Sequence, residues 1–264
     1  MRGSSVERSG AGRDLSGYVA VVTGGNGGIG LGLAHGLVAA GAGVAIWGRN
    51  EEKNAKALAE LRASGGDAEA YVCDVEDQAA VNDTFAASFD RFGRVDAMFA
   101  NAGINRLAPF VEMELEQFRA VLRNHLESTF LCFQVAARHF LERGEGGCLV
   151  GVSSIAASLG QARGAPYSAA KAGIESLVRS VAVELGPSGI RCNTIVPGFI
   201  LTPIWGEEAE ETHAELIEAT SRRTPARRWG TPEDFGAVAA FLADPRLTFH
   251  TGDTIVVDGG FIIT

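Results

Sequence analysis

The sequence predicts a single α/β domain, in which a doubly wound parallel sheet of seven strands is flanked by helices on both faces. From Tyr18 onward, short runs rich in β-branched residues alternate with longer amphipathic stretches, which is typical of successive strand–helix–strand units. The chain has 264 residues, of which 46% are hydrophobic, and this suits one large core. We therefore expect one domain over residues 18–264.

The strands are expected where short β-branched runs occur, and the helices where longer amphipathic patterns separate them. In chain order, the expected strands are Val19–Thr23, Gly43–Trp47, Ala68–Cys73, Ala97–Ala100, Cys148–Val152, Arg191–Val196 and Thr254–Val257. The expected helices are Ile29–Ala40, Glu51–Ala63, Gln78–Phe92, Leu115–Arg143, Tyr167–Leu185 and Thr231–Ala243. Thr231 and Asp234, with Pro232 at the first helical position, predict a capping arrangement at the start of the last helix.

Two segments lack this alternation. Residues 1–17 are rich in Ser, Gly and Arg without periodicity, and we expect them to form a flexible N-terminal arm. Residues 199–230 show no strong regular signal and include an acidic cluster, Glu207–Glu211, that should face water. The apolar side chains near the start of this segment, Phe199, Ile200, Leu201, Ile204 and Trp205, favour a mobile substrate lid. Core packing of the same side chains is the alternative.

Composition excludes several classes of partner. A net charge of −9 argues against nucleic acid or an anionic membrane, because attraction to phosphate needs a basic face. No run approaches the ~18 apolar residues of a membrane span, and the N-terminus lacks the apolar core of a signal peptide, so we expect a cytoplasmic protein. The histidines show no metal-ligand pattern, and we expect no metal. The cysteines lack C-x-x-C spacing and are expected to be reduced, buried thiols: Cys73, Cys132, Cys148 and Cys192.

A glycine-rich loop, residues 23–30 (T-G-G-N-G-G-I-G), follows the first expected strand and opens the first helix. Glycines at such a place let backbone N–H groups and the helix N-terminus approach a pyrophosphate. A merely structural turn is the alternative for any glycine cluster. The strand–turn–helix context favours dinucleotide binding in a Rossmann-type domain.

The T-G-x-x-x-G-x-G spacing of this loop resembles that of the short-chain dehydrogenase/reductase family. Further motifs in chain order extend the resemblance from Leu15 to the C-terminus: Asp74-Val75, Asn101-Ala102-Gly103, Asn124, Ser154, Tyr167-x-x-x-Lys171, Pro197-Gly198 with Thr202, and Val257-Asp258-Gly259-Gly260. The resemblance implies an oxidoreductase that transfers a hydride between a nicotinamide cofactor and a carbonyl or secondary alcohol. It also implies a homo-oligomer, either tetramer or dimer, and the apolar tail Phe261–Thr264 is consistent with a subunit contact or with the end of a core strand.

The resemblance also implies where the cofactor binds. The implied cofactor-binding residues are Gly24, Asn26, Gly28, Ile29, Gly30, Arg49, Asn50, Asp74, Val75, Asn101, Gly103, Tyr167, Lys171, Pro197, Gly198 and Thr202. Within this set, the Asp74 carboxylate would receive the adenine amino group, unless it only caps its own loop. Asn101 would support the fourth strand beside the cofactor.

The expected chemistry depends on Tyr167 and Lys171. Reduction of a ketone needs a proton donor beside the carbonyl oxygen, and the same group removes that proton in the reverse direction. An unperturbed tyrosine, with a pKa near 10, does this poorly, and a nearby ammonium is expected to lower the pKa. Tyr167 and Lys171 are four residues apart in an expected helix, so both project from one face. We predict that Tyr167 is the general acid/base.

Two further residues complete the predicted catalytic set. The resemblance implies that a serine thirteen residues before the tyrosine orients the carbonyl, which selects Ser154. Ser153 has the wrong spacing and would point the opposite way at the end of an extended strand. Asn124 interrupts a long helical pattern. An asparagine there can be a neutral helix residue or can mark a kink, whereas the resemblance implies that Asn124 holds a water that links the lysine to solvent.

The cofactor type is predicted from the end of the second expected strand. An acidic residue there bonds the ribose 2′-hydroxyl in NAD-binding folds. This position holds Gly48, and Arg49 beside it suits a charge-assisted contact to a 2′-phosphate. We therefore predict NADP(H), with NAD as the alternative if Arg49 is only a solvated charge near Glu51 and Glu52.

Gln161, Arg163 and Trp205 are candidates to line the substrate pocket. An NAD-dependent polyol or sugar dehydrogenase is the alternative function. A non-catalytic regulator that senses the cofactor is a remote one, because such a protein would typically lose Tyr167 or Lys171. A sugar-nucleotide epimerase would show different glycine spacing.

Overall fold

The seven strands form one parallel sheet in the order β3-β2-β1-β4-β5-β6-β7. The computed structural model describes residues 14–202, 205 and 212–264, so most of the predicted arm lies outside the described residues. The strands are β1 Val19–Thr23, β2 Gly43–Gly48, β3 Ala68–Val72, β4 Ala97–Ala100, β5 Gly147–Val152, β6 Ile190–Pro197 and β7 Thr254–Val257. All seven predicted strands are therefore confirmed, with differences of one residue at some ends.

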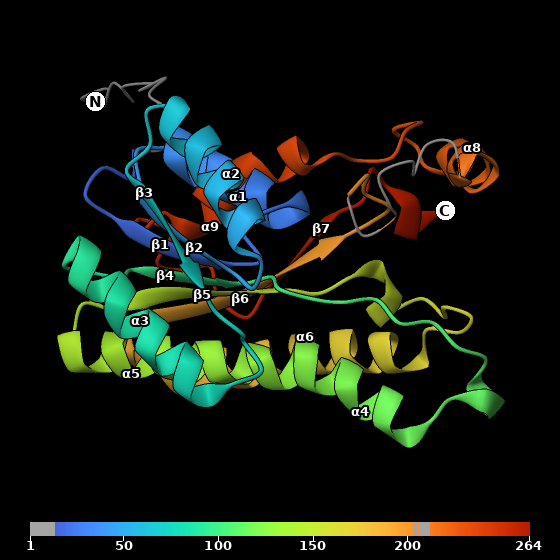
Figure 1. Ribbon diagram of the computed structural model, residues 1–264, viewed down its shortest axis with the longest axis horizontal. Coiled ribbons are helices and arrows are strands. Elements are labelled where there is room, and N and C mark those ends of the chain that lie inside the picture. Colours follow the sequence, from blue (N-terminus) through green and yellow to red (C-terminus); the bar gives the residue numbers. More distant parts are fainter. Residues whose placement is uncertain (1–13, 203–204, 206–211) are drawn as a thin grey trace, which may run out of the picture.

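Helices cover both faces of the sheet, as predicted (Figure 1). Helices α1, α2 and α9 lie on one face, and α3 to α6 lie on the other. The helices are α1 Gly28–Ala39, α2 Glu51–Ala63, α3 Gln78–Phe92, α4 Leu115–Leu122, α5 Ser128–Arg143, α6 Ala165–Leu185, α8 Ala214–Arg223 and α9 Gly236–Ala243. Successive strand residues point to opposite faces, so Val22 packs under α1 while Val21 packs with Val81 and Phe85 of α3.

The predicted helix Leu115–Arg143 is divided in the structure. Helix α4 ends at Leu122, a π-helical turn spans Arg123–Glu127, and α5 follows. Two hydroxyl groups bond back to carbonyl oxygens of this turn: Ser128 Oγ to Asn124 O at 2.5 Å, and Thr129 Oγ1 to His125 O at 2.7 Å. A π turn inside an α-helix is often found at a functional site. The kink that was one interpretation of Asn124 therefore takes this form.

The segment predicted to lack regular structure contains helix α8. Core packing is observed for two of its apolar side chains: Ile200 is buried, and the Phe199 ring stacks on Trp229 with centroids 5.2 Å apart. Trp205 donates its indole N–H to Ile200 O at 3.0 Å. Ile204 and the acidic cluster Glu207–Glu211 lie outside the described residues. The lid stays a prediction.

The last predicted helix begins with a 3-10 turn, Pro232–Phe235, before α9. The capping box of Thr231 and Asp234 is confirmed. The four cysteines are free and buried, as predicted. Among the described residues, no helix is both long and apolar enough to cross a membrane.

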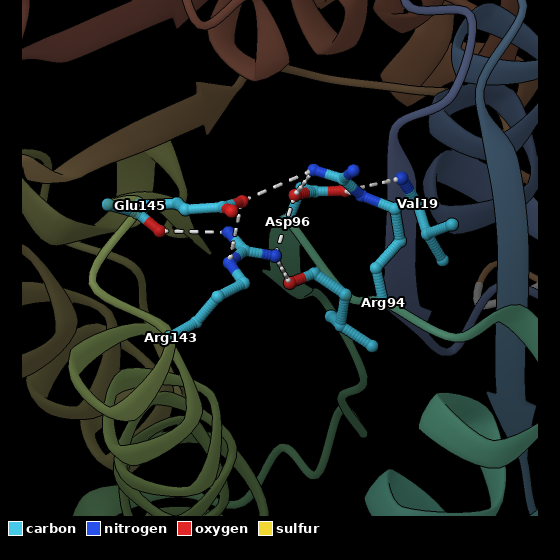
Figure 2. A network of polar contacts seen from close by, with 7 residues as sticks. Val19, Arg94, Asp96, Arg143 and Glu145 are labelled. Atoms are coloured by element: carbon cyan, nitrogen blue, oxygen red, sulfur yellow. Dashed lines mark hydrogen bonds and ion pairs between the residues drawn. The ribbon is translucent and has the colours of Figure 1, made fainter.

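A buried carboxylate joins three parts of the fold at the amino ends of the strands (Figure 2). Asp96, just before β4, accepts the backbone N–H of Val19 at 2.9 Å, and Arg94 donates two hydrogen bonds to it, each 2.8 Å long. Arg143 at the end of α5 donates to Asp96 Oδ1 at 2.8 Å and to Gly146 O at 3.0 Å. This network fixes β1, β4 and the connection to β5 at the edge of the sheet opposite the glycine-rich loop.

Candidate active site

A cavity of about 140 Å³ opens where the carboxyl ends of the central strands meet. Its walls come from the loops that follow β1, β2, β3 and β4, together with the π turn. The lining residues are Gly24, Asn26, Trp47, Gly48, Arg49, Cys73, Val75, Ala102, Gly103 and Asn124. The carboxyl edge of an open parallel sheet is where ligands bind in such folds. Five of the predicted cofactor-binding residues, Gly24, Asn26, Arg49, Val75 and Gly103, thus meet Asn124 in one cavity.

The glycine-rich loop has the geometry of an anion cradle. Gly24 has φ +63° and Gly28 has φ +52°, conformations that favour glycine. A Cβ atom at Gly30 would lie 2.2 Å from Gly24 O, so Ile29 and Gly30 begin α1 in close contact with the loop. No side chain caps α1, and a Cβ at Gly27 would meet nothing within 4 Å. The backbone N–H groups at this helix end fit a pyrophosphate.

Hydrogen bonds hold the loop against its neighbours. Asn101 Nδ2 donates to Thr23 O at 3.0 Å, and the backbone N–H groups of Asn101 and Ala102 donate to Thr23 Oγ1, both at 3.0 Å. This is the supporting arrangement implied for Asn101. The Asp74 carboxylate accepts the N–H of Glu76 at 3.1 Å, so it caps its own turn, which was the alternative for this residue.

The end of β2 leaves no space for a side chain at position 48. A Cβ on Gly48 would lie 2.2 Å from Asn26 Nδ2 and 2.6 Å from Asn54 Oδ1. These two asparagines are hydrogen-bonded to each other at 2.7 Å, and Asn54 is buried. Arg49 is exposed at the cavity wall. The side chain of Asn50 caps α2 by accepting the N–H of Lys53 at 2.8 Å.

Tyr167, Ser154 and Lys171 lie together beside the end of β5. Lys171 Nζ is 5.5 Å from the centre of the Tyr167 ring and donates to Val152 O at 2.7 Å. Ser154 lies close enough to the Tyr167 hydroxyl for a side-chain interaction that lowers the pKa of Tyr167. The Ser153 hydroxyl donates to Lys171 O at 3.0 Å. The four-residue spacing of Tyr167 and Lys171 in α6 thus places the ammonium beside the phenol ring, as expected.

The pKa of Tyr167 differs from expectation. Burial raises the pKa above its usual value of 10, and the interaction with Ser154 offsets this only in part. Burial also lowers the pKa of Lys171 to about 7, because a desolvated ammonium is costly. The prediction that a nearby cation lowers the pKa of Tyr167 is therefore wrong for this structure, since desolvation of the phenolate is the larger effect and raises the pKa.

Asn124 is buried in the π turn. Its Nδ2 donates to Glu76 Oε1 at 2.7 Å, while its Oδ1 is buried without a hydrogen-bond partner in the described part of the chain. An unpartnered buried carbonyl of this kind fits an ordered water.

His125 is a site residue that the sequence analysis did not select. Its ring meets that of Tyr167 edge to face, with centroids 5.2 Å apart, and its Nε2 contacts Ile104 O at 2.6 Å. A Cβ on Gly103 would lie 2.3 Å from this ring, which explains the glycine. Burial, together with the charge of Lys171, lowers the pKa of His125 to about 3. Its position beside Asn124 was the only available signal.

Comparison with known proteins identifies the family. The family described as enoyl-(acyl carrier protein) reductase matches residues 24–262. The chain is 37% identical over 251 residues to L-rhamnose 1-dehydrogenase (NAD(P)(+)) of Sphingomonas sp. (strain SKA58), which covers 94% of this chain and 98% of that protein. The chain belongs to the short-chain dehydrogenase/reductase family. It is an NAD(P)-dependent oxidoreductase that transfers a hydride between nicotinamide and a carbonyl/alcohol pair.

Other similar proteins agree with this family. Gluconate 5-dehydrogenase of Gluconobacter oxydans (strain 621H) is 36% identical, with 95% of this chain and 96% of that protein covered. The crystal structure of a gluconate 5-dehydrogenase from Burkholderia cenocepacia J2315, in complex with NADP and tartrate, has a TM-score of 0.88 and 34% identity. It covers 95% of this chain and 97% of that chain. The Rossmann-type fold of this short-chain dehydrogenase/reductase is thereby confirmed.

The other predicted site residues of this short-chain dehydrogenase/reductase lie at or just after the end of β6 and in the loop before α6. Pro197 ends β6, and Gly198 donates its N–H to Val257 O at 3.1 Å. Thr202 O accepts the N–H of Trp205 at 3.1 Å. Arg163 has φ +65° and accepts the N–H of Ala108 on its carbonyl at 3.1 Å, which ties the loop before α6 to the loop after β4.

Proposed function

We propose that Tyr167 is the general acid/base of this oxidoreductase and that Ser154, Lys171 and Asn124 assist it. The observation that carries the proposal is the grouping of Ser154 beside the Tyr167 phenol, with Lys171 Nζ 5.5 Å from the centre of the Tyr167 ring. Two hydroxyl groups directed at one point can both bond a carbonyl oxygen and stabilise the negative charge that develops on it.

In the proposed mechanism, Ser154 orients the carbonyl oxygen and Tyr167 donates its phenolic proton to that oxygen. The bound nicotinamide supplies the hydride in reduction and accepts it in oxidation. In the oxidative direction, Tyr167 removes the alcohol proton. Lys171 replaces the proton on the tyrosine, and a water on Asn124 Oδ1 connects the lysine to solvent.

We propose NADP(H) as the preferred cofactor. Arg49 is exposed at the cavity wall beside Gly48, where its guanidinium can bond a 2′-phosphate in a forked arrangement. Asn26 and Asn54 fill the space that an NAD-selecting acid at position 48 would need. The B. cenocepacia relative was solved with NADP, which supports the same preference. Arg49→Ala is expected to raise the KM for NADPH at least tenfold, with use of NADH nearly unchanged; unaltered NADPH kinetics would refute the assignment.

We further propose that the substrate is a small polyhydroxylated molecule, such as a sugar, polyol or sugar acid. The similarity to L-rhamnose 1-dehydrogenase and gluconate 5-dehydrogenase supports this class. Asn105 Oδ1, in the loop that contacts both His125 and the Arg163 backbone, is buried and has no hydrogen-bond partner among the described residues, so it can accept a hydrogen bond from a substrate hydroxyl. The alternative of NAD-dependent sugar oxidation uses the same site.

The deciding experiment follows nicotinamide absorbance with NADP(H) and NAD(H) against a panel of sugars, sugar acids, acyl thioesters and steroids. Turnover confined to steroids or acyl thioesters would reject the substrate class. Tyr167→Phe at near wild-type rate would reject the catalytic role. Complete inactivity on every compound would favour the cofactor-sensing regulator.

We also propose that the protein is a homo-oligomer in the cytoplasm, where the nicotinamide pools of the cell are available. The exposed Ile263 in the C-terminal tail is compatible with a subunit contact, although Phe261 packs inside the protomer against Phe199. Light scattering during size-exclusion chromatography measures the oligomeric state, and a monomeric mass at micromolar concentration would reject it. Cell fractionation tests the compartment.

A further inference from the structure

Glu76 makes a contact that neither its sequence position nor the proposed mechanism explains. Its carboxylate Oε1 accepts a hydrogen bond from Asn124 Nδ2 at 2.7 Å, across 48 positions of the chain. Glu76 is an exposed residue in the turn after β3, whereas Asn124 is only 3% exposed. A hydrogen bond from a buried amide to a charged acceptor is stronger than a neutral one.

The chemistry of the pair fixes the orientation of the Asn124 amide. An ionised carboxylate can only accept hydrogen bonds, whereas an amide has one donating and one accepting end. Asn124 must therefore turn its NH2 group toward Glu76 and its carbonyl away. If the amide rotated by half a turn, Asn124 Oδ1 would face the carboxylate, and two acceptors would repel each other.

The orientation that Glu76 enforces is one that the amide would otherwise avoid. Asn124 Oδ1 is buried without a hydrogen-bond partner among the described residues, which is unfavourable for a polar atom. Glu76 thus keeps a free acceptor oxygen available inside the site.

The position of Glu76 is itself well defined. Its N–H donates to Asp74 Oδ1 at 3.1 Å, and Asp77 caps α3 immediately afterwards by accepting the N–H of Ala79 at 2.8 Å. Arg123 on the π turn is hydrogen-bonded to Glu116, and its charge also interacts with the carboxylates of Glu76 and Glu127. The hydrogen bond from Asn124 Nδ2 is the contact that ties the Glu76 carboxylate to the site.

We infer that Glu76 is a positioning residue that holds Asn124 Oδ1 toward the active site as a water acceptor. The inference rests on the proposed role of Asn124 and adds a residue outside the motifs of the family resemblance. Because Glu76 acts through Asn124, its loss should slow turnover without weakening the binding of NADPH.

The test compares Glu76→Ala and Glu76→Gln with Glu127→Ala, each measured for kcat and for the KM of NADPH and substrate. Glu127 is an exposed glutamate on the same π turn, so its removal changes the same charge, and no hydrogen bond joins it to Asn124 in the described structure. Glu76→Ala is expected to lower kcat by about fivefold to tenfold with both KM values within about twofold. Glu76→Gln keeps an acceptor oxygen and is expected to recover part of kcat, while Glu127→Ala stays at the wild-type value.

Asn124→Ala and the Glu76→Ala/Asn124→Ala double variant separate the two levels of inference. If both act through one amide, the double variant has the kcat of Asn124→Ala. Wild-type kcat in Asn124→Ala would overturn the proposed role of Asn124. The positioning role alone would be overturned if Asn124→Ala lowered kcat while Glu76→Ala left kcat unchanged. It would also be overturned if the two losses of kcat multiplied in the double variant, or if Glu127→Ala lowered kcat as much as Glu76→Ala.

Discussion

Introducing an acid at Gly48 tests how the end of β2 selects the cofactor. By comparison with NAD-binding folds, Gly48→Asp should favour NADH. The structure predicts otherwise, because a Cβ at this position lies 2.2 Å from Asn26 Nδ2 and 2.6 Å from Asn54 Oδ1. Asn54 cannot turn its amide without losing two bonds, since its Nδ2 donates to Gly48 O at 2.9 Å and to Tyr71 O at 3.0 Å.

The magnitude follows from which contact gives way. Asn26 is the more accessible partner, and its displacement breaks the 2.7 Å bond to Asn54. The buried Asn54 Oδ1 then loses its donor, which costs about 1–3 kcal/mol, and a carboxylate at position 48 adds a second acceptor beside it. We expect both Gly48→Ala and Gly48→Asp to lose about 1–3 kcal/mol of unfolding free energy.

Thermal unfolding and kinetics with both cofactors measure these effects. For a protein of this size, the loss corresponds to a Tm lowered by roughly 2–10 °C. Gly48→Ala separates the steric effect from the charge. Gly48→Asp should lose NADPH turnover through repulsion of the 2′-phosphate and gain little NADH turnover. A Gly48→Asp enzyme with wild-type Tm and efficient NADH use would refute the reasoning.

Three further predictions concern stability and chemistry. Asp96→Ala removes a buried carboxylate and leaves two partly buried arginines and the Val19 N–H without their acceptor, so it should lower the unfolding free energy by about 3 kcal/mol in urea denaturation. Asp67→Ala breaks an exposed pair with Arg91 and should cost less than about 1 kcal/mol. Tyr167→Phe should lower kcat by at least about 100-fold while NADPH still binds by calorimetry. Folding lowers the pKa of His125 from 6.5 to about 3, so between these two pH values only the unfolded chain binds a proton at this imidazole. The free energy of unfolding should therefore rise with pH across that range, by up to about 1.4 kcal/mol per pH unit. His125→Asn should reduce this slope.

Each of these has a contrary result. Equal losses in Asp96→Ala and Asp67→Ala would show that burial does not strengthen the Asp96 network. Loss of NADPH binding in Tyr167→Phe would indicate a binding role instead of proton transfer. An unchanged pH slope in His125→Asn would mean that other groups dominate acid unfolding.

The sequence alone was enough to predict the sheet and most of the helices that flank it. Alternation of β-branched runs with amphipathic stretches reports directly which side chains are buried, so the strands were located within a residue. The glycine loop and the Tyr167–Lys171 spacing were equally readable, because backbone freedom and helix periodicity are local properties. Helix α8 was missed because prolines and acidic residues around it obscured a short amphipathic pattern.

Other features depend on contacts between distant segments, and only the tertiary structure decided them. The reversed pKa shift of Tyr167 arises from desolvation by everything packed around the ring, which no spacing encodes. The bond from Glu76 to Asn124 and the Asn26–Asn54 pair join loops that meet only when the strands align. Residue spacing thus determined which groups could be predicted to perform the chemistry, whereas packing determined their charge, orientation and supporting residues.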